Sequence, residues 1–145
     1  HRHQVKYLIV GGEAVIYYGH TRLTGDIDLF YGRIGENVER LYAALLDFWG
    51  NDVPGVGDAA ELAQEGLIVQ FGVPPNRIVL INRIAGVQFD LAWPRRTTVA
   101  VGEPTDEVPI HYLGMDDLIK NKRAAGRPKD LEDLRFLERR RTQDS

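Results

Sequence analysis

The chain has 145 residues, of which 43% are hydrophobic and 27% charged, a composition typical of a single globular domain large enough to bury a core. Its formal net charge of −3 argues against a generally basic nucleic-acid-binding protein, and the absence of cysteine excludes disulfides and thiolate metal sites. The lack of cysteine fits a cytoplasmic protein, and because no apolar run approaches the roughly 18 residues that a membrane span requires, we expect no membrane partner.

Hydrophobic periodicity and Gly/Pro breakers divide the chain into short strands and helices. In chain order, the first half predicts a buried strand at 5–10, a helix at 12–18, a strand at 26–31, an amphipathic helix at 37–49 and a short helix at 59–64. The second half predicts strands at 67–71 and 77–82, a strand or short helix at 87–93, a hairpin of 97–101 with 109–112, and helices at 115–125 and 129–140.

These elements predict an α/β (α+β) fold with a small mixed β-sheet and flanking helices. We expect a single domain, residues 1–145, with a core at about 5–112 and a C-terminal helical segment at about 113–141. The amphipathic pattern of 37–49 includes Phe48 and Trp49, and we expect these aromatic side chains to belong to the core.

A pair of carboxylates lies in the stretch 7–30, which reads YLIVGGEAVIYYGHTRLTGDIDLF. Alternate residues of a strand face the same side, so Asp26 and Asp28 are expected to project together, while Ile27 and Leu29 face the opposite, buried side. Like charges this close are costly to bury unless a cation lies between them, and hard divalent ions prefer oxygen ligands. The pair therefore predicts a site for Mg²⁺ or Mn²⁺.

A glycine pair precedes these acids and ends the first strand. Because Gly11 and Gly12 have no Cβ, the backbone there can approach a phosphate closely, and the first amides of the following helix can face it. Together the two motifs predict a site for a metal-bound nucleoside triphosphate. Taken separately, each motif has a structural alternative, since glycines and acids are common in turns.

The stretch resembles the DNA polymerase β-like nucleotidyltransferase superfamily, in which Gly-Gly or Gly-Ser is followed, after a short helix, by Asp-x-Asp in a strand. In this chain Gly11-Gly12 is followed by thirteen residues and then Asp26-Ile27-Asp28. Arg22-Leu23-Thr24 and the stretch 117–131 resemble the small prokaryotic branch, whose members are often linked to toxin–antitoxin or abortive-infection systems. The resemblance covers nearly the whole chain and implies a nucleotidyltransferase fold.

The resemblance implies an enzyme that transfers a nucleoside monophosphate from a Mg²⁺-bound NTP to a hydroxyl acceptor, with pyrophosphate leaving. Asp26 and Asp28 would be the catalytic acids and would hold the metal. The acceptor would be an RNA, such as a tRNA 3′ end, or a protein side chain. A cognate toxin or antitoxin, or a second copy in a homodimer, would supply the acceptor-binding surface.

The residues that the resemblance implies for NTP binding combine the glycine turn with polar and basic side chains: Gly11, Gly12, Arg22, Thr24, Lys122, Arg127 and Lys129. Lys122 is the best candidate for offsetting charge on the leaving pyrophosphate. Arg22 and Thr24 have an alternative role in the turn before the acids. Asp130 lies at the start of the last helix, where we expect it to act locally rather than bind metal.

A third carboxylate is usually present in active members of the superfamily, on a later strand. The branch would have Arg-Ile-Asp-Leu-Leu there, whereas 77–81 reads Arg-Ile-Val-Leu-Ile, so Val79 stands where the acid is expected. Asp90 is the candidate substitute, and the alternative is a solvated acid beside Phe89 and Trp93. Without the third acid, the second hypothesis is a catalytically weakened nucleotide- or partner-binding module. A metal-dependent phosphodiesterase is a third.

Overall fold

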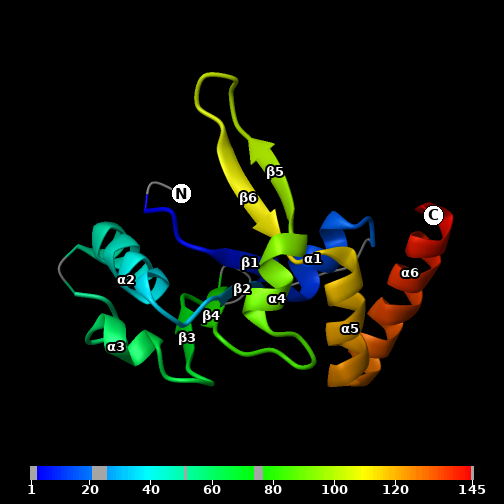
Figure 1. Cartoon of the computed structure of the whole chain (residues 1–145), viewed down its shortest axis with the longest axis horizontal. Coiled ribbons are helices and arrows are strands. Elements are labelled where there is room, and N and C mark those ends of the chain that lie inside the picture. Colours follow the sequence, from blue (N-terminus) through cyan, green and yellow to red (C-terminus); the bar gives the residue numbers. More distant parts are fainter. Residues whose placement is uncertain (1–2, 21–25, 51, 74–76, 145) are drawn as a thin grey trace.

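The computed structural model describes residues 3–20, 26–50, 52–73 and 77–144, and a six-stranded mixed β-sheet organises this part of the chain (Figure 1). The strand order is β3-β4-β2-β1-β6-β5. The strands are β1 (Tyr7–Val10), β2 (Asp26–Tyr31), β3 (Ile68–Phe71), β4 (Arg77–Ile81), β5 (Thr97–Val101) and β6 (Val108–Tyr112). β1 pairs antiparallel with β2 and parallel with β6, and β2 pairs parallel with β4.

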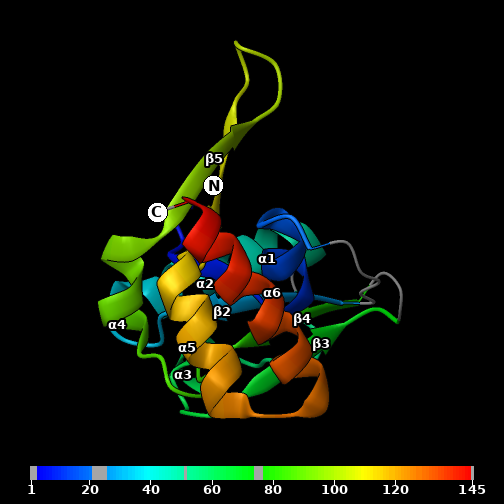
Figure 2. The same ribbon diagram turned by 90° about the vertical axis from the view of Figure 1, so that its right-hand side faces the viewer.

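Helices cover the sheet at two ends. Their bounds are α1 (Gly11–Tyr17), α2 (Glu36–Trp49), α3 (Ala59–Leu62), α4 (Phe89–Ala92), α5 (Met115–Ala125) and α6 (Pro128–Asp144), and a 3₁₀ turn (Trp93–Arg95) follows α4. In Figure 1, α2 and α3 lie at one end of the molecule, and α5 and α6 lie at the other. Both views show α5 and α6 side by side (Figure 2). No helix in the described ranges combines the length and the apolar character needed to cross a bilayer.

The alternation of side chains along the strands divides the core into two apolar clusters, one for each face. The first cluster joins β1 and the start of α1 to α5 and α6 through Leu8, Val10, Ala14, Leu118 and Leu137. The second joins β2, β3 and β4 to α2 and α3 through Tyr31, Leu41, Leu62, Val69 and Leu80. The first cluster, which faces α5 and α6, therefore lies on the same sheet face as the even-numbered residues of β2.

The fold class and the order of elements confirm the prediction from the sequence. β2 and α5 have the predicted bounds, the stretch 87–93 takes the helical alternative, and 97–112 forms the expected hairpin. This hairpin extends from the body as a two-stranded arm (Figure 2).

Three predictions of burial were wrong. Ile27 is 41% exposed, because the second apolar cluster begins at Leu29 and leaves the first residues of β2 and β4 uncovered on that face. Phe48 is 76% exposed and Trp49 is 39% exposed, because the last turn of α2 lies at the edge strand β3, where Trp49 packs against Phe71 and Phe48 packs only against Trp49 among the ring contacts of the described residues. The helical period therefore predicted which residues share a face of α2 but not how far the core reaches along it.

Candidate functional site

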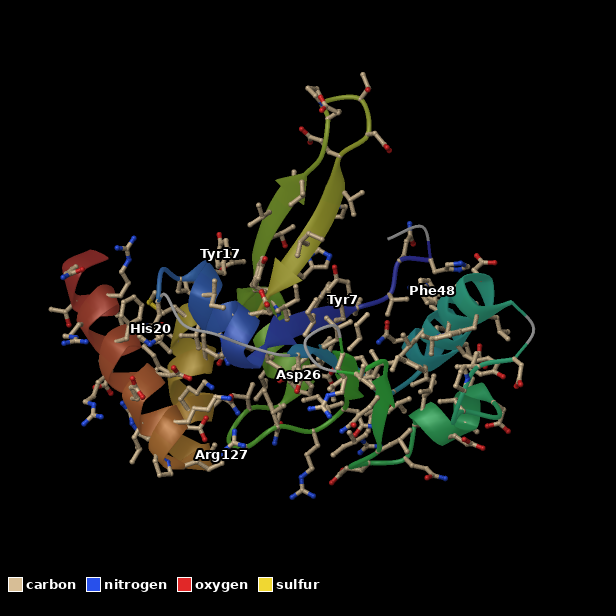
Figure 3. All side chains as sticks on the ribbon, turned by 180° about the vertical axis from the view of Figure 1, so that it is seen from behind. Tyr7, Tyr17, His20, Asp26, Phe48 and Arg127 are labelled. Carbon is tan, nitrogen blue, oxygen red and sulfur yellow. The ribbon has the colours of Figure 1, made fainter. Side chains whose placement is uncertain are left out.

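The two predicted acids lie at the start of β2, on the sheet face that α5 and α6 cover. Because β2 and β4 are parallel and in register, Asp26 is paired with Arg77 and Asp28 with Val79. Paired residues of adjacent strands project to the same face, so these four side chains lie together. Figure 3 views this side of the molecule, with Asp26 near the middle and Arg127 toward α6.

Asp26 is engaged by a cation of the chain itself. Arg77 Nε donates to Asp26 Oδ1 at 2.9 Å, and Arg77 Nη2 donates to Asp26 Oδ2 at 2.7 Å. These hydrogen bonds hold the pKa of Asp26 below its usual value, and the charges of Arg77 and Lys129 act in the same direction. Asp26 is therefore ionised and held in a bidentate pair.

Asp28 has a different environment. No described residue donates a hydrogen bond to its half-buried carboxylate, and its Oδ2 lies against the backbone of Gly11, where a Cβ would be only 2.5 Å away. Burial raises the pKa of Asp28, and the negative charge of Asp26 raises it further, whereas the charges of Lys122, Lys129 and Arg77 oppose the rise. Asp28 thus lacks the nearby cation that Asp26 has.

The donor set fits one divalent ion better than a closed metal cage. Asp26 and Asp28 present carboxylate oxygens on one face, and Val79, only 8% exposed, stands beside Asp28 where a third carboxylate would be needed. Within the described ranges, no group of three or more His, Cys, Asp or Glu side chains is placed to hold a metal. Mg²⁺ commonly takes one or two carboxylates and completes its octahedron with water and substrate phosphates, which these residues allow.

Lys122 is placed differently from the prediction. Its side chain is buried, at 3% exposure, and its Nζ lies 3.2 Å from Asp130 Oδ1 and 3.1 Å from Asp133 Oδ2. This ion-pair cluster of Lys122, Asp130 and Asp133 joins α5 to α6 inside the protein. Lys122 still influences Asp28 through its charge, but two carboxylates hold its ammonium group away from a direct role at a leaving group.

Arg127, the residue before α6, and Lys129, in the first turn of α6, are exposed, and Figure 3 shows Arg127 on the same side of the molecule as Asp26. Arg127 Nε donates to Asp130 Oδ2 at 2.6 Å, which confirms a local role for Asp130. Burial raises the pKa of Asp130, but hydrogen bonds from Arg127 and Lys122 outweigh it and leave that pKa below the usual value. The charge of Lys129 acts on both Asp26 and Asp28.

Asp90 does not lie beside Asp26 and Asp28. It is an exposed residue of α4 and lines a surface cavity with Lys6 and Gly32, the residues just before β1 and just after β2. Because β1 and β2 are antiparallel, this cavity lies at the opposite end of β2 from Asp26. The structure therefore favours the alternative of a solvated acid. Arg22 and Thr24, the other predicted polar residues, lie outside the described residues.

Arg77 is the residue that the sequence prediction missed. Arg77 and Val79 have the same i, i+2 spacing as Asp26 and Asp28, so parallel pairing of the two predicted strands would have placed the guanidinium beside the first acid. The spacing was visible, but the register between strands distant in sequence was not.

We expect Gly11→Ala to destabilise the protein more than Gly126→Ala. Both glycines have a positive φ, +68° and +66°, which costs a residue with a Cβ about 1–2 kcal/mol. Only at Gly11 does the added Cβ also collide with a side chain, Asp28, since the nearest atom to the new Cβ at Gly126 lies at an ordinary contact distance of 3.8 Å. Urea denaturation would measure the difference, and equal losses in the two variants would contradict the close contact.

We expect Lys122→Met to lower the free energy of unfolding by about 3–5 kcal/mol, because it removes the buried ammonium group that lies between the carboxylates of Asp130 and Asp133. Lys120→Met, on the exposed face of the same helix, is the matched control and should change stability by no more than about 0.5 kcal/mol. Chemical denaturation of both variants checks this, and a small effect of Lys122→Met would show that the cluster does not stabilise the packing of α5 on α6.

We expect Asp28→Asn to stabilise the protein at pH 7. Because the pKa of Asp28 is raised above 3.8 in the folded state, ionisation costs the fold free energy at every pH above that raised value. The gain should shrink as the pH falls through the raised pKa and vanish below 3.8. Thermal unfolding from pH 7 to pH 3 measures it, with Asp116→Asn, an exposed acid of α5, as control. A destabilised Asp28→Asn variant at pH 7 would contradict the assignment.

Residues 1–138 match a protein family described as a nucleotidyltransferase of unknown function (DUF6036). The match includes all six strands of the sheet and most of α6, so the chain belongs to this family. No protein with a curated description matches the sequence. The family agrees with the nucleotidyltransferase resemblance that the Gly11-Gly12 and Asp26-Ile27-Asp28 motifs indicate.

Proposed function

We propose that this nucleotidyltransferase-family protein binds a nucleoside triphosphate with a divalent cation, Mg²⁺ or Mn²⁺, and transfers the nucleoside monophosphate to a hydroxyl acceptor. The observation that supports the proposal best is the state of Asp28. Its carboxylate is half-buried, accepts no hydrogen bond from the described residues, and lies beside a second acid and against the backbone of Gly11. Such an arrangement costs the fold stability unless a cation and its ligand complete it.

Asp26 and Asp28 would hold the metal ion, which, when bound, would neutralise charge developing on the transferred and leaving phosphate oxygens. The exposed Lys129 and Arg127, whose charges act on Asp28, would bind the triphosphate electrostatically from the α6 side. Gly11 makes room for the Asp28 carboxylate itself, because a Cβ there would lie 2.5 Å from Asp28 Oδ2.

In the transfer, the acceptor oxygen forms a bond to the α-phosphorus as the bond from that phosphorus to the bridging oxygen of the β-phosphate breaks. The hydroxyl proton would pass to water, because the apolar Val79 stands where a further carboxylate would receive it. Pyrophosphate leaves with the electron pair of the broken bond. The expected rate is therefore lower than that of a site with a third acid, because general-base assistance typically contributes about 100-fold or more.

The acceptor hydroxyl would belong to an RNA, such as a tRNA 3′ end, or to a protein side chain. The branch resemblance of Arg22-Leu23-Thr24 and of the stretch 117–131 supports a role in a toxin–antitoxin or abortive-infection system. A cognate toxin or antitoxin, or a second copy of the chain, would then supply the surface that binds the acceptor.

A second candidate is a nucleotide- or partner-binding module with weakened catalysis. Two observations favour it: the apolar Val79 lies in register with Asp28, and Arg77 already occupies both oxygens of Asp26. In this alternative the site would still bind an NTP, but the transfer step would be too slow to matter.

Label transfer separates the two candidates. Purified protein is incubated with Mg²⁺ or Mn²⁺, each α-labelled NTP, and either total cellular RNA or cellular protein. We expect label on one acceptor class, a loss of about 100-fold or more in Asp26→Asn/Asp28→Asn, and no loss in the control Asp116→Asn.

Absence of label, with NTP binding still detected by calorimetry, would support the binding module instead. Val79→Asp then tests decay from an enzyme, because a restored acid beside Asp28 should restore transfer. If none of these proteins binds an NTP or transfers label, both candidates are contradicted.

A further inference from the structure

The two carboxylates of the site differ in the cations available to them. Asp26 has both oxygens engaged by the guanidinium of Arg77, at 2.9 and 2.7 Å, whereas Asp28 receives no hydrogen bond from any described residue. Both acids lie on one face of β2, two residues apart. The chain therefore pairs one of the two carboxylates directly with a cation and acts on the other only through more distant positive charges.

The backbone holds Arg77 in this position. Arg77 and Asp26 are partners in the parallel pairing of β4 with β2, so their Cα atoms are fixed next to each other. The guanidinium has a further anchor on β3, since Arg77 Nη1 donates to Gln70 Oε1 at 3.4 Å. The pair is only about a third exposed, with side-chain exposures of 30% for Arg77 and 27% for Asp26, so water screens it incompletely.

A metal ion on Asp26 would meet this guanidinium directly. The ion would need an oxygen lone pair of Asp26, but both oxygens already accept hydrogen bonds from Arg77. The ion would also lie a few ångströms from the guanidinium, which stays protonated and positively charged in proteins. The neighbouring position on β4 offers no further ligand, because Val79 is apolar and buried. Asp28, which lies against the backbone of Gly11, is not hydrogen-bonded by Arg77, whose charge acts on it only from a longer distance.

We propose that the guanidinium of Arg77 serves as a permanent cation for Asp26. The site then binds one divalent ion, held mainly by Asp28, instead of two divalent ions shared by both acids. This inference rests on the proposed function, since it concerns the same nucleotide site. Arg77 takes the place of a second metal: it neutralises Asp26 permanently and weakens the hold of Asp26 on the divalent ion at Asp28.

The test measures Mn²⁺ binding alone, by electron paramagnetic resonance, without nucleotide or turnover. Wild-type protein should bind one Mn²⁺ per chain. Arg77→Gln removes the competing charge and should bind Mn²⁺ about tenfold more tightly, as expected for deleting a unit charge close to a divalent ion in a partly solvated site. Arg77→Lys keeps the charge and should bind like the wild type.

Arg95→Gln is the matched control, because Arg95 makes the same kind of bidentate pair with Asp117, at 3.0 and 2.7 Å, between the turn after α4 and helix α5. It changes the net charge equally, and its Mn²⁺ affinity should stay within about twofold of the wild type. Thermal unfolding of each variant confirms that it is folded before binding is measured.

Equal Mn²⁺ affinities in Arg77→Gln and Arg95→Gln would overturn the inference. So would two equivalent Mn²⁺ ions in the wild type, or an Arg77→Lys variant that binds Mn²⁺ as tightly as Arg77→Gln does. The label-transfer assay keeps the proposed function separate. If the wild-type protein transfers label but Arg77→Gln binds Mn²⁺ no more tightly, this inference fails and the proposed function stands. If the wild-type protein neither binds Mn²⁺ nor transfers label, both fail.

Discussion

The parallel pairing of β2 with β4 brings an acid, a second acid, an arginine and a valine onto one face of the sheet. A shift of one residue in this register would turn Arg77 and Val79 to the other face and leave both carboxylates without a neighbour of either kind. The bidentate pair of Arg77 with Asp26, the half-buried Asp28 without such a pair and the lack of a third acid beside it all follow from this one pairing. The chemistry of the site therefore depends on backbone hydrogen bonds between strands that are about fifty residues apart.

Positive charge around the carboxylates is arranged at two depths. Lys122 is buried with Asp130 and Asp133, where it holds α5 against α6 and acts on Asp28 only through its charge. Arg127 and Lys129 lie on the surface at the start of α6, within reach of solvent. The buried ion pairs thus position the helix that carries the exposed cations, so that stability and the electrostatics of the site depend on the same cluster.

Local patterns predicted much of the fold, and the site in part. Alternation in Asp26-Ile27-Asp28 correctly placed both acids on one face, and helical periodicity predicted α5 with its observed bounds. The same reasoning failed for the burial of Ile27, because the extent of a core is not encoded in local periodicity. It left open whether Asp90 is a third acid or a solvated one, which depends on the end of the sheet to which α4 returns. The family resemblance suggested Lys122 for the phosphate but could not reveal its buried partners.

The sequence by itself determined the kinds of elements, their order, the carboxylate pair beside a glycine turn and the apolar residue at position 79. These depend on side-chain size, on the missing Cβ of glycine and on spacing of two or four residues, all of which are local properties of the chain. Only the tertiary structure decided that Arg77 lies on Asp26, that Asp28 has no such partner and that Lys122 is enclosed by two acids. These outcomes depend on strand register and helix packing, which bring together charges that are far apart in sequence and remove them from water.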